Sequence, residues 1–123
     1  MNCKKVNIYI DKKTILKKIK VNNKNMKTGI ELIREERQEQ ITKHGRIIDD
    51  DIKFNISGQL ADGAYGLIEF SDEEYPSDRI SYFKPPGWDS KIWEHMCKKS
   101  YKDRLIIAGA LIAAEIDRIQ RIL

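Results

Sequence analysis

Two charged residues, Arg37 and Glu115, lie where the sequence predicts the apolar faces of two long helices. At 100° per residue, Arg37 falls in the centre of a stripe formed by Ile30, Ile33 and Ile41. Glu115 is central on the last helix, whose apolar face comprises Leu105, Ala108, Leu111, Ile112, Ile116, Ile119 and Ile122. Burying either charge is costly unless it is paired or binds a ligand. We therefore expect either a buried Arg37–Glu115 ion pair that fixes the helix register or a polar ligand pocket.

Carboxylates on these helices could also hold Mg²⁺, which prefers oxygen ligands. Two pairs have suitable local spacing, Glu36 with Glu39 and Glu69 with Asp72. However, Glu39 and Glu69 are predicted to point outward, and Asp72 lies beyond its helix. The set with a more plausible geometry is Glu36, Asp51 and Glu115. Those three residues would be the metal ligands if the chain is a magnesium-dependent enzyme; otherwise no cofactor is expected.

Aromatic residues between positions 82 and 101 cluster in sequence next to the cations Lys84 and Arg104. Aromatic faces beside cations suit a nucleobase and its phosphates. The alternative is that Trp88 and Trp93 form the hydrophobic staple of a short helix, which suits Trp93 better than Trp88. No catalytic residue is predicted. The predicted ligand-binding residues are Glu36, Arg37, Gln40, Asp51, Lys84, Trp88, Arg104 and Glu115.

The first helix that carries these residues is bounded by clear signals. Thr28 and Glu31 predict a capping box at its start, and Gly45 is placed to end it. An acidic loop over residues 49–51 is expected to follow. A second helix, capped by Ser57, is predicted over residues 58–70.

Two further helices are predicted after a long loop over residues 71–87. Asp89 is the expected N-cap of a short helix, and Ser100 with Asp103 repeats the capping-box pattern at the start of the last helix. That helix is expected to run almost to Leu123. The predicted fold is mainly α, a small bundle of three long helices plus a short one, with an N-terminal β-hairpin.

The hairpin is predicted from residues 6–10 and 15–21, within a basic arm that spans residues 1–25; residues 26–123 form the helical domain. Residues 1–27 contain nine lysines and one aspartate, a local charge of +8 within a net charge of +4, which leaves -4 on the remaining residues. Such an arm could bind nucleic acid, or it could be a solvated hairpin whose charge discourages edge pairing.

Composition limits the chain to one domain. It has 123 residues, of which 41% are hydrophobic and 34% charged, and no apolar run approaches the length of a membrane span. Cys3 and Cys97 are isolated in the sequence, which is typical of free thiols in a reducing cytoplasm. A core of about three helices is thin, so we expect a homodimer or a higher homo-oligomer.

Five segments, ELIREERQEQITKHG, DDD, GQLADGAY, PPGWD and AGALIAAEIDR, resemble a family of short phage and prophage proteins. The resemblance covers about residues 29–120 and implies a cytoplasmic location in an infected bacterial host. Two positions depart from the family pattern, Arg46 for a frequent Trp and Asp50 for a frequent His. The polar residues that the resemblance carries over are Glu36, Arg37, Gln38, Gln40, Asp51, Glu115 and Arg118.

Three functions follow as hypotheses. The first is an accessory protein that binds a nucleotide or nucleotide-derived signal and sequesters it from host anti-phage defence. The second is a Mg²⁺-dependent nucleotide pyrophosphohydrolase that uses Glu36, Asp51 and Glu115, with Arg37 or Lys84 on phosphate. The two carboxylate pairs resemble the magnesium site of the MazG-like enzymes of that kind. The third is an interaction module that binds nucleic acid or protein through residues 1–27.

Overall fold

The computed structural model describes residues 26–45 and 48–122, and this part of the chain is mainly helical, as predicted. No strand occurs within these ranges. The predicted hairpin and basic arm, residues 1–25, lie outside them. The elements in chain order are α2 (Gly29–Thr42), α3 (Ile48–Phe54), α4 (Gln59–Ile68), the short 3-10 helix η1 (Ser77–Arg79), α5 (Ser90–Cys97) and α6 (Tyr101–Ile122).

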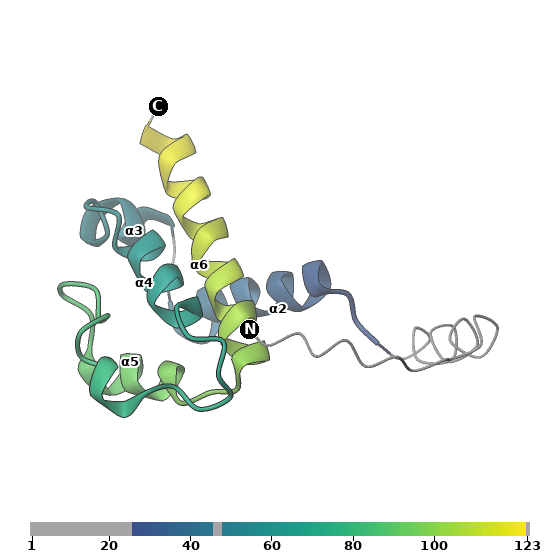
Figure 1. Cartoon of the computed structure of the whole chain (residues 1–123). Helices are drawn as coiled ribbons and strands as arrows, with labels where there is room; N and C mark the ends of the chain where they lie inside the picture. Colours follow the sequence, from purple (N-terminus) through teal and green to yellow (C-terminus); the bar gives the residue numbers. More distant parts are fainter. Residues whose placement is uncertain (1–25, 46–47, 123) are drawn as a thin grey trace.

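The long helix α6 is the centre of the fold, and α2, α3 and α4 all pack against it (Figure 1). Its buried face includes Ile107, Leu111 and Ala114, which join Leu67 of α4 and Trp93 of α5 in one hydrophobic core. None of the helices in the described ranges is long and apolar enough to cross a membrane.

The predicted helix starts are confirmed at three places. Thr28 Oγ1 accepts a hydrogen bond from the Glu31 amide at 3.2 Å, and the Glu31 carboxylate accepts from the Thr28 amide at 3.3 Å, which completes the capping box of α2. Asp89 Oδ1 accepts from the Ile92 amide at 2.9 Å and caps α5. Ser100 Oγ accepts from the Asp103 amide at 3.2 Å before the first turn of α6.

The prediction of an acidic loop over residues 49–51 was wrong, because this segment belongs to helix α3 (Ile48–Phe54). Its three consecutive aspartates suggested a solvated loop, yet Asp51 and Asn55 lie one turn apart and bond to each other. The predicted Ser57 cap of α4 was also wrong. Gly58, with φ of 81°, is the N-cap residue, and the Gln59 side chain accepts the Ser57 amide proton at 2.8 Å instead.

Parts of the two predicted isoleucine stripes are not buried. Ile30 of α2 is 73% exposed. On α6 the buried face is rotated away from the isoleucines, toward Arg104, Ala108 and Leu111. The residues of the predicted α6 face that remain exposed are Leu105, Ile112, Ile116, Ile119 and Ile122. Arg37 and Glu115 are nevertheless buried, each 8% exposed, as predicted.

Candidate functional site

A cluster of buried charges lies where α2, α3 and α6 meet. Arg37 of α2 reaches Asp51 of α3, with Nη2 3.9 Å from Oδ2, and Asp117 of α6, with Nη2 3.7 Å from Oδ2. Glu115 pairs instead with Arg118, one turn along α6, at 2.5 Å. Arg37 and Glu115 therefore do not pair with each other; Arg37 pairs with two aspartates, and Glu115 pairs with Arg118. Mutual charge compensation accounts for their burial, since an unpaired buried charge would be strongly destabilising.

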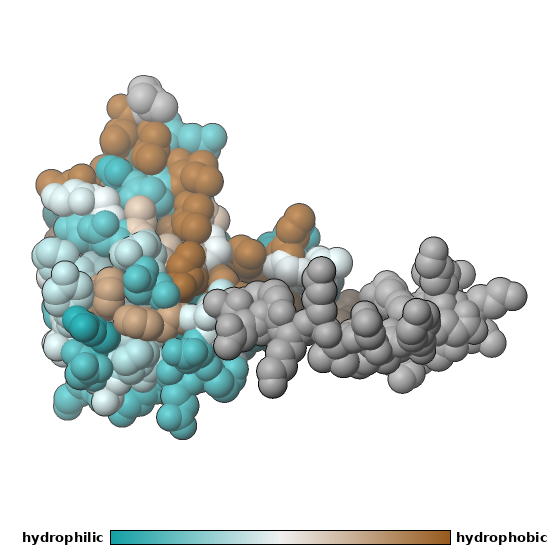
Figure 2. All heavy atoms as spheres, viewed as in Figure 1, coloured by the Kyte–Doolittle hydropathy of each residue, from teal (hydrophilic) through white to brown (hydrophobic). Residues whose placement is uncertain are grey.

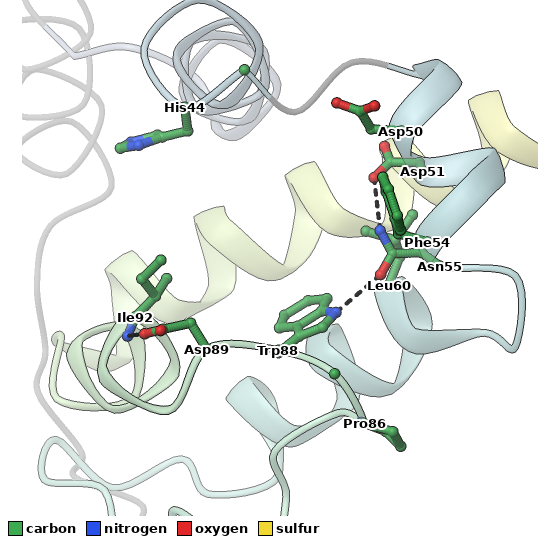
Figure 3. A pocket seen from close by; sticks show the side chains of 12 residues that line it. His44, Asp50, Asp51, Phe54, Asn55, Leu60, Pro86, Trp88, Asp89 and Ile92 are labelled. Carbon is green, nitrogen blue, oxygen red and sulfur yellow. Dashed lines mark hydrogen bonds between the residues drawn. The ribbon is translucent and has the colours of Figure 1, made fainter.

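Asp51 connects this buried cluster to Trp88, a half-buried residue that packs against the hydrophobic core. Asn55 Nδ2 donates to Asp51 Oδ1 at 2.9 Å, and Trp88 Nε1 donates to Asn55 Oδ1 at 3.0 Å (Figure 3). The chain Arg37–Asp51–Asn55–Trp88 thus fixes the indole ring by its only N–H group. The ring face is left to form the wall of a pocket.

The first pocket has a volume of about 430 Å³ and lies between the end of α2, helix α3 and the loop before α5. Figure 3 shows Asp50, Asp51 and Asp89 on its walls, with the Trp88 ring between the aspartates of α3 and Asp89. Its character is acidic and aromatic. A ligand with hydrogen-bond donors on a flat ring would suit this pocket, whereas the carboxylates would repel a bare phosphate. The remaining lining residues are His44, Gly45, Phe54, Asn55, Leu60, Pro86, Gly87 and Ile92.

A second pocket, of about 530 Å³, adjoins the first, and His44 and Ile92 line both. Lys91, His95 and Lys99 supply its basic groups, while Glu36 and Glu39 are acidic. Glu39 is largely neutralised by Lys43, whose Nζ lies 2.7 Å from its carboxylate, and this hydrogen bond lowers the pKa of Glu39. The second pocket therefore offers cations that the first lacks.

Gln40 lies at the floor of the second pocket and is only 2% exposed. Its Nε2 donates to Glu36 Oε1 at a long 3.4 Å, and its Oε1 has no hydrogen-bond partner among the described residues. A buried carbonyl oxygen without a donor costs free energy. A ligand donor that reaches Gln40 would recover that cost.

Two predicted ligand-binding residues, Lys84 and Arg104, line neither pocket and bond to backbone carbonyls. Lys84 Nζ donates to the Trp88 carbonyl at 2.9 Å, so Lys84 holds the loop that carries the tryptophan. Arg104 is 0% exposed and donates to the carbonyls of Lys99, Leu67, Phe70 and Asp72. With no surface exposed, Arg104 is reassigned from ligand binding to anchoring the end of α4 and the loop after it.

The predicted magnesium ligands do not meet. Glu36 lines the second pocket, Asp51 bonds to Asn55 beside the first, and Glu115 pairs with Arg118. Within residues 26–45 and 48–122, no three acidic, histidine or cysteine side chains lie close enough together to share a metal ion. The described side chains therefore do not fit a magnesium site.

The sequence prediction missed much of the site. Lys91 and His95 are four residues apart, the spacing that puts side chains on one face of a helix, and this signal could have found them; Lys99 follows the end of α5. Asn55 follows Asp51 at the same interval of four, but this spacing brings two side chains together only in a helix, and no helix was predicted there. Glu36, Gln40, Asp51 and Trp88 were predicted and do line the two pockets.

No family model, curated protein or solved structure was found to match this chain.

Proposed function

We propose that this chain binds a nucleotide or a nucleotide-derived signalling molecule across the two adjoining pockets. The observation that carries the proposal is their opposite character: an aromatic, acidic pocket opens beside a pocket with cations, and His44 and Ile92 line both. A nucleotide has the same division, a flat base with N–H donors at one end and phosphates at the other.

The base end is assigned to the first pocket. The Trp88 ring offers a stacking surface, and base–aromatic stacking contributes about 1–3 kcal/mol per base. Asp50 and Asp89 present carboxylate oxygens that can accept hydrogen bonds from exocyclic amino groups or ring N–H groups. Ile92 supplies apolar contact where the two pockets join.

The phosphate end is assigned to the second pocket. Lys91 and Lys99 are point charges that bind phosphate oxygens, and His44 and His95 add further donors. Glu36 also lines this pocket, so a ligand with a single phosphate, or with hydroxyl groups that donate to Glu36, would fit better than a bare triphosphate. Cyclic nucleotides and other nucleotide-derived signals meet this description.

A binding protein of this kind needs no catalytic group, and we propose that it sequesters its ligand in the cytoplasm of an infected bacterial host. The resemblance to short phage proteins supports that setting. We further propose that it acts as a homo-oligomer, for which the exposed isoleucines of α6 provide a surface.

The test is a thermal-shift and calorimetric screen with mononucleotides, cyclic oligonucleotides and cyclic ADP-ribose isomers. We expect at least one of them to raise Tm and to be recovered intact after heating. Lys99→Ala should weaken that ligand's binding at least about tenfold, since a charge-assisted contact is worth about 1.5–3 kcal/mol. Lys98→Ala removes the same charge one residue away, from an exposed pair with Glu94, and should leave affinity unchanged.

Two results would overturn the proposal. One is that no nucleotide in the panel shifts Tm or gives a calorimetric signal. The other is that Lys98→Ala and Lys99→Ala weaken binding equally, which would indicate general electrostatic attraction. Release of pyrophosphate from dNTPs with Mg²⁺ would instead favour the pyrophosphohydrolase hypothesis. Loss of nucleic-acid binding on deletion of residues 1–24 would favour the hypothesis of an interaction module that binds through residues 1–27.

A further inference from the structure

Helix α6 has an apolar face that the described elements leave largely exposed, although Ile33 of α2 contacts it at Gly109. Ile112, Ile116 and Ile119 are 46%, 51% and 41% exposed, and Leu105 on the same face is 42% exposed. Figure 2 shows hydrophobic surface along α6, and Figure 1 shows this helix extending past α3 toward the C-terminus. Exposed apolar bands of this length mark interaction surfaces in soluble proteins.

The band continues into an apolar groove at the N-terminal end of α6. Leu105 belongs to both, and the groove, of about 570 Å³, is completed by Ile106 and by Met26, Leu32 and Ile33 from the α2 region. At Gly109 the side chain of Ile33 lies directly on the α6 backbone, so the α2 contact occupies that side of the helix. The band on α6 therefore lies beside α2, with the groove at one end and free isoleucines at the other.

The spacing of the band makes it complementary to itself. Leu105 and Ile119 each lie seven residues from Ile112, and seven residues are two helical turns. Two α6 helices packed antiparallel about a two-fold axis at Ile112 would place Ile112 against its counterpart. The same axis would place Ile119 of each copy against Leu105 and the groove of the other. An isologous interface requires this kind of symmetry, in which one patch meets itself.

The area of the surface suits a dimer. Leu105, the three isoleucines, Ile122 and Met26 together expose roughly 500 Å² of apolar surface, counting about 170 Å² for each fully exposed side chain. A standard interface buries about 800 Å² per partner, of which roughly 60% is apolar, again on the order of 500 Å². A small ligand would cover only a fraction of this band.

We propose that the exposed face of α6 is the interface of an antiparallel, two-fold homodimer centred on Ile112. The proposal does not depend on nucleotide binding, because the residues that line the two pockets include none of Leu105, Ile112, Ile116, Ile119 and Ile122; the α6 residue that lines the second pocket is the buried Ile107.

The first test measures the mass of the full chain by light scattering during size-exclusion chromatography. We expect a dimer for the wild type. Ile112→Asp should weaken association at least about 100-fold, because the axis brings two uncompensated charges together in an apolar interface. Ile56→Asp, which changes a 65% exposed isoleucine between α3 and α4, is the matched control and should remain dimeric.

The second test does not depend on how Ile112→Asp folds. In a Cys3→Ser background, Ile112→Cys should form a disulfide-linked dimer on mild oxidation, while Ile56→Cys should not. Leu105→Cys and Ile119→Cys should each crosslink poorly alone and efficiently when the two variants are mixed. A monomeric wild type, a dimer that Ile112→Asp leaves intact, or self-crosslinking at Leu105→Cys and Ile119→Cys would each overturn the antiparallel dimer.

Discussion

The substitution Gly63→Ala probes how closely α4 supports the tryptophan of the first pocket. A Cβ atom at position 63 would lie 2.6 Å from Trp88 Cη2 and 2.8 Å from Cζ3. Non-bonded carbon atoms prefer separations of about 3.5–4.0 Å, so the indole ring must move back by roughly 1 Å. The ring is held by its 3.0 Å hydrogen bond to Asn55 and by an edge contact with Trp93, and it cannot move without weakening both.

The expected change in stability is the sum of three terms. Overpacking costs about 1–3 kcal/mol, and loss of the Trp88–Asn55 bond about 0.5–1.5 kcal/mol. The higher helix propensity of alanine over glycine stabilises the folded state by about 1 kcal/mol. The free energy of unfolding should therefore fall by about 2 kcal/mol, which lowers Tm by roughly 8 °C in a chain of this length.

Chemical denaturation followed by tryptophan fluorescence measures this change, and the native emission of Trp88 should shift as its ring moves. Gly29→Ala is the control, because nothing lies within 4 Å of a Cβ at that position of α2, and it should be as stable as the wild type or slightly more so. Equal stability of Gly63→Ala and the wild type, with unchanged native fluorescence, would refute the packing of Trp88 on α4.

Three further perturbations have defined outcomes. Gly109→Ala places a Cβ 2.6 Å from Ile33 Cδ1 and should destabilise by about 1–2 kcal/mol in urea denaturation. Arg104→Met leaves four carbonyls without their donor and should cost at least about 4 kcal/mol, visible as loss of a cooperative thermal transition. Burial raises the pKa of the Cys97 thiol to about 12, so in a Cys3→Ser chain a thiol reagent at pH 8 should react only after unfolding.

The raised pKa of Cys97 also means that the free energy of unfolding falls as pH rises in the alkaline range. The fold favours the protonated thiol, so its contribution is complete below the ordinary thiol pKa and is lost as pH rises toward 12. Burial likewise raises the pKa of Tyr75, whose hydroxyl donates to the Gly66 carbonyl at 2.7 Å, and its contribution is lost in the same direction. Cys97→Ala should reduce the alkaline loss of stability, measured as Tm between pH 8 and pH 11.

Local signals allowed α2, α5 and α6 and their starts to be predicted, because capping depends on side chains within four residues of each other. Thr28 with Glu31 and Asp89 with Ile92 are examples. Helix α3 could not be predicted in this way. Seven residues with three consecutive aspartates have no helical signature, and α3 is stabilised by packing on α6 and by the Arg37–Asp51 contact, which are not local.

The site was only partly predictable for a similar reason. Periodicity placed Arg37 and Glu115 on buried faces but could not choose their partners, which depend on the rotation of each helix about its axis. Arg104 was assigned to a ligand because cations beside aromatic residues suit phosphates. Its cationic side chain does lie over the rings of Tyr75 and Tyr101, yet the surrounding carbonyls come from residues more than 30 positions earlier as well as from Lys99.

The most direct test of the two-pocket proposal is the crystal structure of the chain with the nucleotide that gives the largest rise in Tm. We predict that the base stacks on the Trp88 ring, that Asp50 or Asp89 accepts a hydrogen bond from it, and that phosphate oxygens lie within hydrogen-bond distance of Lys91 or Lys99. A ligand bound elsewhere, or one whose phosphates lie against the aspartates of the first pocket, would contradict the assignment of the two pockets.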